Sequence, residues 1–315
     1  MILLDVVIVN WNAGEQILDC LNSLQAASRG SDLIKLSSCV IVDNASTDGS
    51  LDSLPEFGLP ITIIKNVDNK GFGYACNQGS KIGNSKYILF LNPDVRLSLD
   101  SLVKTVSFME EPRNQKIAAT GIQFVSDGKI QRTAARFPTK TSFFYQMLGL
   151  DRLWPGRFPP LLMTDWDHEE SRELDHVPAS FLLIRRKIVE DLQGFDERFF
   201  MYYEDLDLSF RIKQAGWKIY YLATVQSFHR GGGTSQQVKS ERLFYVLCSR
   251  VYYVAKHFGY WNAIRIMIAS VLLEFWVRLG WSLVKLSYRT FIETIEAYGR
   301  FVWVFPRLLK DLKNK

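Results

Sequence analysis

Three carboxylates crowd the segment from Phe199 to Arg211, where an aromatic run gives way to a helical pattern. They are Glu204, Asp205 and Asp207. Acids in the first turn of a helix are stabilised by its dipole, and Asp207 can form a surface pair with Arg211 one turn on, so a structural interpretation covers part of the pattern. Aromatic side chains beside carboxylates also suit a site where a carboxylate takes a proton from a substrate. The stretch alone leaves both interpretations open.

Polar clusters also follow the apolar segments of the first hundred residues, at the points where expected strands end. The expected strands are residues 3–9, 40–42, 61–65 and 87–91, and the expected helices are 15–27, 71–82 and 99–109. Continuous apolar strands that alternate with helices indicate a parallel, doubly wound α/β sheet. Such sheets bind ligands at the carboxyl ends of their strands. We therefore expect the polar clusters to form one binding site.

Two of these clusters suit a nucleotide. Asp43 can accept a hydrogen bond from the imide N–H of a uracil or thymine ring, although its polar neighbours are equally good turn and cap residues. Residues 69–77 form a glycine-rich entry to a helix, where Lys70 and the helix start favour an anion. This segment carries neither the Walker nor the Rossmann fingerprint.

A third cluster suits a metal ion. Asp94 follows the fourth expected strand directly, in the sequence Asn92-Pro93-Asp94. A carboxylate at a rigid turn suits a hard divalent cation that bridges a diphosphate, and an ordinary Asn-Pro turn is the alternative. His229 precedes three glycines, which allow close approach to a ligand, but a lone histidine is more often structural.

Composition narrows the functional class. The chain has 315 residues, a net charge of +5 and four scattered cysteines, which we expect to be free thiols in a reducing cytosol. No zinc motif or RNA-binding signature is present, so nucleic acid is not an expected partner. The first strand lacks the basic region of a signal peptide, and no stretch offers the uninterrupted apolar run of a membrane-spanning helix.

Residues 140–175 mix aromatics, prolines and charges without a period, which is typical of a binding loop or a mobile lid. Candidates for contact with an acceptor are two arginines, Arg132 and Arg136, and three ring side chains, Trp154, Trp166 and His168. Solvated surface for the arginines and core packing for the rings are the alternative interpretations.

The segment 261–315 is amphipathic. The charged residues of a helix expected over 264–290 share one narrow face at about 100° per residue, and they are Glu274, Arg278, Lys285 and Arg289. A wide apolar face with flanking tryptophans suits a membrane interface, and the basic tail 310–315 suits anionic head groups. Burial against a partner subunit, in a homo-oligomer, is the competing interpretation.

Together and in this order, the motifs closely resemble the family-2 inverting glycosyltransferases with the GT-A fold. The motifs are Val9-Asn10-Trp11-Asn12, Val42 to Ser50, Asn69-Lys70-Gly71-Phe72-Gly73, Leu91-Asn92-Pro93-Asp94, Gly194 to Phe200 and Glu204 to Leu208. The resemblance covers roughly the first 260 residues and looks strongest for the bacterial rhamnosyltransferase-type branch. Asn92 replaces the first acid of the family's common Asp-x-Asp, which leaves Asp94 as the better metal ligand.

The resemblance implies a Rossmann-like nucleotide-binding half over residues 1–98, an acceptor half over 99–260 and a helical segment over 261–315. It implies that Asp205 is the catalytic base and that Glu204 and Tyr203 contact the acceptor. A divalent ion, Mg²⁺ or Mn²⁺, would be held by Asp94 and His229. The implied nucleotide-sugar contacts are Asn10, Asn12, Asp43, Asn44, Lys70, Gly71, Asn77 and Asn92, with Arg230 and Thr234 near the diphosphate.

The expected reaction is inverting transfer of one sugar from a nucleotide diphosphate sugar to a lipid-linked or cell-surface glycan. We expect it at the cytoplasmic face of the plasma membrane, through peripheral contact. dTDP-rhamnose is the expected donor and a UDP-sugar the alternative. The Gln-x-x-Arg-Trp motif of processive synthases is missing, which favours a single transfer. A nucleotide-binding scaffold without chemistry is the alternative from another class.

Overall fold

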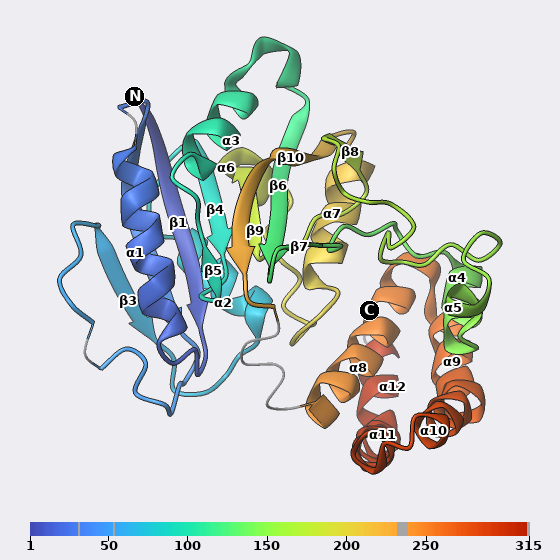
Figure 1. The fold of residues 1–315 in the computed structure, drawn as a ribbon. Helices are drawn as coiled ribbons and strands as arrows, with labels where there is room; N and C mark the ends of the chain where they lie inside the picture. The colour runs from blue at the N-terminus through green and yellow to red at the C-terminus, as the bar shows by residue number, and fades with distance from the viewer. Residues whose placement is uncertain (31, 53, 232–238, 314–315) are drawn as a thin grey trace.

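A mixed sheet forms the centre of the protein, with helices on both faces and a further group of helices beside it (Figure 1). The computed structural model describes residues 1–30, 32–52, 54–231 and 239–313. Within these residues the sheet has ten strands, in the order β3-β2-β1-β4-β9-β6-β10-β5, and β7 and β8 pair with β6 and β10.

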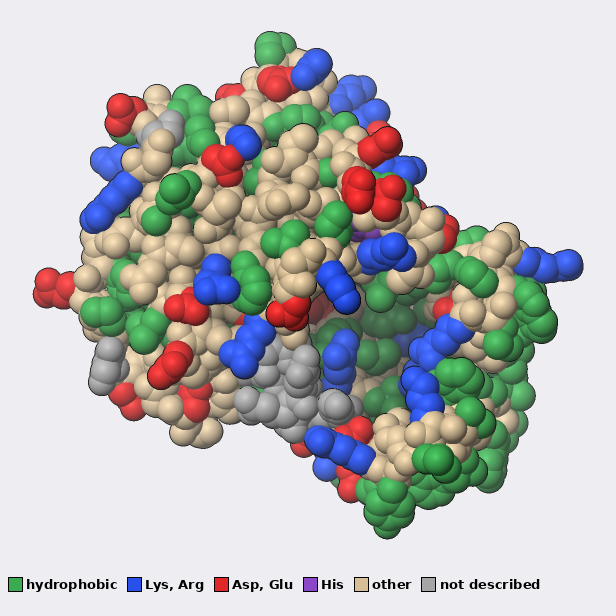
Figure 2. Space-filling model, in the orientation of Figure 1, with side chains coloured by type: hydrophobic (Ala, Val, Ile, Leu, Met, Phe, Trp, Pro, Cys, Tyr) green, Lys and Arg blue, Asp and Glu red, His purple; other side chains and the backbone are tan. Residues whose placement is uncertain are grey.

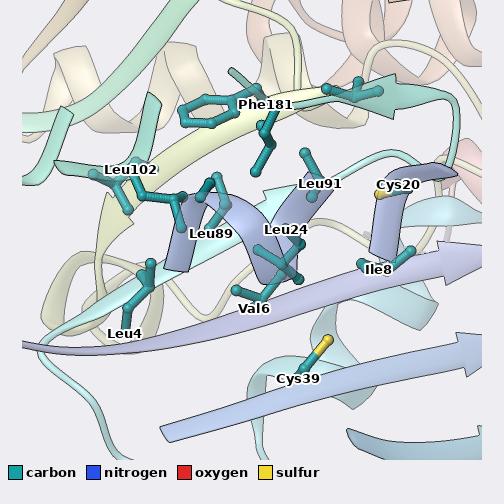
Figure 3. Close-up of a cluster of buried hydrophobic side chains, with 14 of the residues drawn as sticks. Leu4, Val6, Ile8, Cys20, Leu24, Cys39, Leu89, Leu91, Leu102 and Phe181 are labelled. Atoms are coloured by element: carbon teal, nitrogen blue, oxygen red, sulfur yellow. The ribbon is translucent and has the colours of Figure 1, made fainter. Parts of the chain in front are cut away.

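The first four strands form a parallel sheet, as the apolar runs predict. They are β1 (Ile2–Asn10), β2 (Ile34–Asp43), β3 (Ile61–Lys65) and β4 (Tyr87–Leu91). Alternate residues of a strand point to opposite faces, so β1 contributes Leu4 and Ile8 to one core and Val7 to the other. Figure 3 shows Ile8 beside Cys20, and Val6 beside Leu24, of the covering helix α1 (Gln16–Arg29).

The second half of the sheet mixes strand directions. Its strands are β5 (Val95–Arg96), β6 (Ile117–Ser126), β7 (Lys129–Gln131), β8 (Arg172–Leu174), β9 (Phe181–Arg185) and β10 (Lys218–His229). The strand β9 runs antiparallel between β4 and β6, while β10 is parallel to β6. The short strand β5 pairs with the end of β10, which sets Val95 opposite His229. This pairing brings Asp94 beside the histidine although the two are far apart in the sequence.

Helices cover both faces of the sheet. The helices α1 and α3 (Ser101–Glu110) pack on one face, and α2 (Phe72–Ser80), α6 (Arg186–Asp191) and α7 (Glu204–Gln214) pack on the other. The segment 140–175 is less irregular than expected, because it contains α4 (Lys140–Met147) and α5 (Leu150–Leu153). A short 3-10 helix, Pro112–Asn114, follows α3.

The C-terminal helices form a third apolar core together with Phe199 and Leu206 of the acidic stretch. They are α8 (Lys239–Phe258), α9 (Tyr260–Ala269), a π-helical turn (Ser270–Glu274), α10 (Phe275–Val284), α11 (Tyr288–Trp303) and α12 (Phe305–Lys313). The acidic stretch and these helices therefore share a core, so the two parts of the chain depend on each other for stability.

Two expectations for this region are wrong. The helix expected over 264–290 ends at Val284, because Leu286 adopts a left-handed conformation with φ 50°, and so the predicted charged stripe is divided between two helices. Its first member, Glu274, points inward, since the π-helical turn places it against the buried Arg250 (Nη2–Oε2 2.5 Å).

The second error concerns membrane-spanning length. In the described residues, the continuous helical stretch Tyr260–Val284 has 25 residues and contains an 18-residue window with a mean hydropathy of 1.5, so it is long and apolar enough to cross a bilayer by length and composition alone. About a third of that stretch is buried inside the protein, and the core helix of a soluble protein can pass the same test.

Candidate active site

A cavity of about 480 Å³ opens at the carboxyl edge of the parallel strands, beside the C-terminal helices. Figure 2 shows it as a hollow with an apolar floor and Lys or Arg side chains on its rim. Its lining includes seven of the predicted site residues, which are Asn44, Asn92, Asp94, Tyr203, Glu204, Asp205 and His229. The fold thus gathers side chains from the ends of several strands and from the start of α7 around one space.

Asp205 lies in the first turn of α7 with its side chain 22% exposed to the cavity. Its carboxylate accepts hydrogen bonds from the backbone N–H groups of Ala179 (3.2 Å) and Leu206 (2.8 Å). His176 Nε2 lies 3.8 Å from Oδ2, and the hydroxyl of Ser209 lies 2.9 Å from His176 Nδ1. Burial lowers the pKa of His176, so a neutral imidazole orients the carboxylate without a full positive charge.

The backbone before Asp205 is strained. Tyr202 and Tyr203 both have positive φ, 67° and 69°, which costs about 1–3 kcal/mol per residue unless the surroundings impose it. The surroundings do so from two sides. Phe72 N–H of α2 donates to the Phe200 carbonyl (3.0 Å), and the Ser249 hydroxyl of α8 donates to the Met201 carbonyl (2.8 Å).

Glu204 is buried, and its Oε2 has no hydrogen-bond partner among the described residues. Burial, and after it the neighbouring Asp205 charge, raises the pKa of the Glu204 carboxyl well above its usual range. A carboxyl group kept neutral in this way can donate a hydrogen bond to a polar group of a ligand in the cavity.

Asp207 has the structural role predicted for it, but the pair is buried and not on the surface. Its Oδ2 accepts from Arg211 Nε (2.8 Å), and its Oδ1 lies 2.7 Å from His257 Nε2 of α8. Lys256 Nζ donates to the same carboxylate (2.8 Å). Burial raises the pKa of Asp207, but the hydrogen bond from His257 and the Arg211 charge outweigh it and hold the pKa below its usual range. These contacts hold α7 against α8.

Asp94 and His229 face each other across the β5–β10 pair, with Oδ1 and Nε2 3.5 Å apart and both side chains 11% exposed. Asp94 Oδ1 is buried without a hydrogen-bond partner in the described part of the chain. Gln131 Oε1 lies 2.9 Å from His229 Nδ1, and Gln131 Nε2 donates to the His229 carbonyl (2.7 Å). A proton on Nδ1 leaves the lone pair of Nε2 directed toward Asp94.

This pair of donor atoms fits a divalent cation such as Mn²⁺ or Mg²⁺, which binds one or two protein ligands and fills its remaining positions with water and phosphate oxygens. No group of three or more His, Cys, Asp or Glu side chains with metal-binding geometry occurs in the described residues.

The ends of β1 and β2 are joined by a polar network. Asn10 Nδ2 donates to Asp43 Oδ1 (3.1 Å) and to the hydroxyls of Ser46 and Ser50 (3.0 Å each). Asn10 Oδ1 is buried and has no partner among the described residues, and Asn10 does not line the cavity. Asn12 Oδ1 accepts from the backbone N–H of Thr47 (2.7 Å).

Asn44 fixes the loop that leads into α2. Its Nδ2 donates to Asn69 Oδ1 (2.8 Å) and to the Gly71 carbonyl (3.2 Å), and its Oδ1 accepts from the Lys70 N–H (3.1 Å). These hydrogen bonds restrain the loop, and such a restraint reduces the entropy cost of binding a ligand there.

The comparison with known protein families agrees with this geometry. A family model described as Glycosyl transferase family 2 matches residues 5–193. The chain belongs to glycosyl transferase family 2. It is a glycosyltransferase, and the mixed sheet with its C-terminal helices is a GT-A fold.

Relatives of this family-2 glycosyltransferase include two rhamnosyltransferases. An N-acetylglucosaminyl-diphospho-decaprenol L-rhamnosyltransferase of Mycobacterium tuberculosis is 27% identical over 278 residues, covering 82% of this chain and 87% of the relative. The rhamnosyltransferase WbbL of Escherichia coli is 26% identical over 171 residues, covering 54% of this chain and 62% of the relative.

Among solved structures, the mannosyltransferase PcManGT from Pyrobaculum calidifontis, in complex with GDP-Man and Mn²⁺, resembles this glycosyltransferase with a TM-score of 0.53 at 14% identity. The match covers 96% of this chain and 87% of that one. TarS 1–349 of S. aureus, in complex with UDP-GlcNAc, matches with a TM-score of 0.51 at 16% identity, covering 98% and 83% of the two chains. At sequence identities of 14% and 16%, these two matches show a similar fold and nothing more.

Several residues predicted to contact ligands are used elsewhere in this glycosyltransferase. Lys70 pairs with Asp68 (3.0 Å) and does not line the cavity. The Asn77 amide holds the backbone of Phe195, with Nδ2 2.8 Å from the carbonyl and Oδ1 2.8 Å from the N–H. We therefore do not retain Lys70 and Asn77 as donor-binding residues. Gly71 makes room for Phe200, whose carbonyl oxygen would lie 2.4 Å from an added Cβ.

The residues predicted to contact the acceptor also fall into two groups, those that line the cavity and those that lie elsewhere. Arg136 is engaged in a bidentate pair with Asp165 (2.9 and 2.7 Å), whereas Arg132 lines the cavity. Trp166 stacks on the buried His168 with ring centroids 4.2 Å apart, so both serve packing, and Trp154 is exposed outside the cavity lining. Arg230 donates its N–H to the Asp94 carbonyl (3.2 Å), and Thr234 lies outside the described residues.

Sequence reasoning missed Gln131 and His176 as supports of the site. Gln131 sits in a short strand and contacts a histidine 98 positions away, and nothing in its sequence surroundings points to that contact. His176 carries a weak signal, since it is one of only four histidines and precedes a buried strand.

Proposed function

We propose that this enzyme transfers one rhamnosyl residue from dTDP-rhamnose, with inversion, to a lipid-linked glycan. The observation that carries the proposal is that Asp205, Asp94 and His229 line one cavity, which supports a reaction in which a base and a bound cation act on the same substrate. The choice of sugar rests on the Mycobacterium tuberculosis rhamnosyltransferase, which aligns with 82% of this chain. We assign donor binding to residues 1–98 and acceptor binding to 99–260.

Asp205 is the base in this proposal. Its carboxylate takes the proton of the acceptor hydroxyl while that oxygen bonds to the anomeric carbon, and the bond from that carbon to the diphosphate oxygen breaks on the opposite face. His176 and the Ala179 N–H orient the carboxylate for this transfer. A divalent cation bound by Asp94 and His229 would supply charge neutralisation for the departing diphosphate. Neutral Glu204 would donate a hydrogen bond to the acceptor sugar.

Replacing Asp205 by Asn tests the base. We expect the rate of rhamnosyl transfer to fall by about 10²–10⁴-fold, while the dissociation constant for dTDP-rhamnose stays within about twofold because the donor contacts lie elsewhere. Asp32→Asn, an exposed carboxylate far from the cavity lining, is the control. Release of nucleotide diphosphate and the product mass are measured with dTDP-rhamnose and, in parallel, with UDP-sugars. Full transfer by Asp205→Asn would refute the assignment of the base.

An assay of nucleotide diphosphate release by the wild-type protein distinguishes an active enzyme from an inactive nucleotide-binding scaffold. An inactive scaffold would bind nucleotide sugars without releasing nucleotide diphosphate, whatever acceptor and Mn²⁺ or Mg²⁺ are added. A UDP-sugar turned over in place of dTDP-rhamnose would leave the proposed mechanism intact and correct the donor.

We further propose that the C-terminal helices rest on the cytoplasmic face of a membrane. Figure 2 shows hydrophobic side chains gathered over the lower right of the molecule, where Figure 1 places these helices. The exposed apolar residues there include Trp261, Leu272, Trp276, Trp281, Val284, Leu286 and Trp303. Exposed Arg265, Lys285 and Arg289 lie among them, a combination that suits anionic lipid.

Sedimentation with vesicles tests this surface. We expect binding to vesicles that contain phosphatidylglycerol, weaker binding to neutral vesicles, and loss of binding when Trp276 and Trp281 are both replaced by Ser. A dimer in detergent-free buffer that ignores vesicles, and that the same double substitution dissociates, would replace the lipid by a second copy of the chain.

A further inference from the structure

We propose that Arg132 and Arg242 bind a phosphate or diphosphate group of the acceptor, attached to the sugar that is being extended. This inference rests on the proposed glycosyl transfer. Both arginines line the cavity that contains Asp205. They come from different parts of the fold, since Arg132 follows β7 beside the sheet and Arg242 lies in the first turn of α8.

Neither arginine is neutralised by a carboxylate within the part of the chain that the structure describes. Arg132 donates through Nη1 to the Thr164 carbonyl, and the Arg242 guanidinium lies over the Tyr202 ring, 5.6 Å from its centroid. These contacts hold the side chains in place and leave their positive charge uncompensated. Arginine is the residue whose planar donors match phosphate oxygens best.

Other arginines near the site show the contrast. Arg136 is paired with Asp165, Arg211 with Asp207, and the buried Arg250 with Glu274. Each of these has a carboxylate partner and a clear structural role. Arg132 and Arg242 are instead exposed at the cavity, where their guanidinium groups can meet an anionic ligand without first breaking an ion pair.

The position of the two arginines favours the acceptor over the donor as the source of that anion. In the proposed function, the donor diphosphate binds beside Asp94 and His229, where β5 pairs with the end of β10. Arg242 instead lies over the ring of Tyr202, three residues before Asp205. Asp205 and the two arginines line one cavity of about 480 Å³, so an acceptor sugar and the phosphate attached to it can occupy the same space.

Two soluble acceptors with the same sugar test the inference, one a short-chain alkyl diphosphate sugar and the other the neutral alkyl glycoside. We expect the wild-type KM to be at least about tenfold lower for the diphosphate. Arg132→Gln and Arg242→Gln should each raise that KM about tenfold, the size of one charge-assisted hydrogen bond. The KM for the neutral glycoside, the KM for dTDP-rhamnose and kcat should change by less than about threefold.

Arg157→Gln is the matched control, because Arg157 is exposed in the same half and does not line the cavity. Lysine at position 132 or 242 should restore part of the affinity if charge is what matters. A rise in the KM for dTDP-rhamnose, or faster loss of donor to water, would assign the arginines to the donor diphosphate and overturn the inference. An equal effect on both acceptors would also overturn it.

Calorimetry separates this inference from the proposed function. Binding of the alkyl diphosphate sugar to the donor-loaded protein needs no turnover. Binding that depends on both arginines supports the anion site even if no sugar is transferred, in which case the proposed function fails. Transfer to both acceptors with equal KM supports the function and overturns the anion site.

Discussion

Gly71 and Gly259 have almost the same backbone conformation, and only one of them is crowded. Both precede the first residue of a helix, with φ 93° and ψ 164° at Gly71 and φ 93° and ψ 161° at Gly259. A Cβ added at Gly259 would meet no atom within 4 Å, whereas at Gly71 it would lie 2.4 Å from the Phe200 carbonyl oxygen and 2.9 Å from its Cα. Alanine at the two positions therefore separates the backbone cost from the collision.

The shared cost is that of an L-residue in a region reserved for glycine, about 1–3 kcal/mol in the free energy of unfolding. The collision adds to it at Gly71 alone. Real Cβ contacts are essentially never shorter than 3.0 Å, so Phe200 has to retreat by about 0.6 Å. Overpacking of this kind costs about 1–3 kcal/mol more. We expect Gly71→Ala to lose that much more stability than Gly259→Ala in urea unfolding.

We also expect the kcat values of Gly71→Ala and Gly259→Ala to differ, because Phe200 precedes Tyr202 and Tyr203, the strained residues that lead to Asp205. A misplacement of about 1 Å can cost about 10²-fold in rate, so we expect kcat of Gly71→Ala to fall about 10- to 100-fold. Gly259→Ala should keep kcat within about twofold. Equal kcat values for two folded variants would refute the claim that Gly71 positions the catalytic stretch through Phe200.

Two further predictions concern supports of the site. Gln131→Ala should weaken Mn²⁺ binding by about 10- to 100-fold in a titration, because His229 loses the partner of its Nδ1–H, and unchanged affinity would remove Gln131 from the site. Burial raises the pKa of Glu274, but Arg250 and Arg278 outweigh it and hold the pKa at about 2. Since this folded value lies below the unfolded one of about 4.3, its stabilisation is present above about pH 4.3 and is lost as pH falls toward 2. Urea unfolding of Glu274→Gln should show a loss of about 3–5 kcal/mol at pH 7 and a shallower acid slope, and an unchanged slope would contradict the assignment.

The parallel strands and their polar ends could be predicted from the sequence, because a strand buried on both faces must be a continuous apolar run. The predicted bounds of β4 agree with the structure for this reason, and those of β3 also agree, although β3 is a half-exposed edge strand. The polar residues at strand ends are close in space wherever neighbouring strands are parallel. This accounts for the correct expectation that Asn44, Asn92 and Asp94 share a cavity.

Other features depend on contacts that no local pattern encodes. The inward direction of Glu274 follows from a π-helical turn, which shifts the helical phase assumed at 100° per residue. The two side-chain contacts of Gln131 with His229 depend on the pairing of β6 with β7 and with β10. Sequence cannot assign Lys70 and Asn77, because the same side-chain chemistry can serve a ligand or the protein's own side chains and backbone.

The buried contact between Asp207 and α8 has a consequence for biosynthesis. A ribosome completes the sheet and the base helix before Lys256 and His257 exist, so the emerging chain holds a buried carboxylate with only Arg211 beside it. The strained turn at Tyr202 and Tyr203 also lacks its anchor at Ser249 until then. Truncated translation products should therefore be unable to transfer sugar, and the nascent enzyme should gain its activity only when the segment that we assign to the membrane is about to emerge.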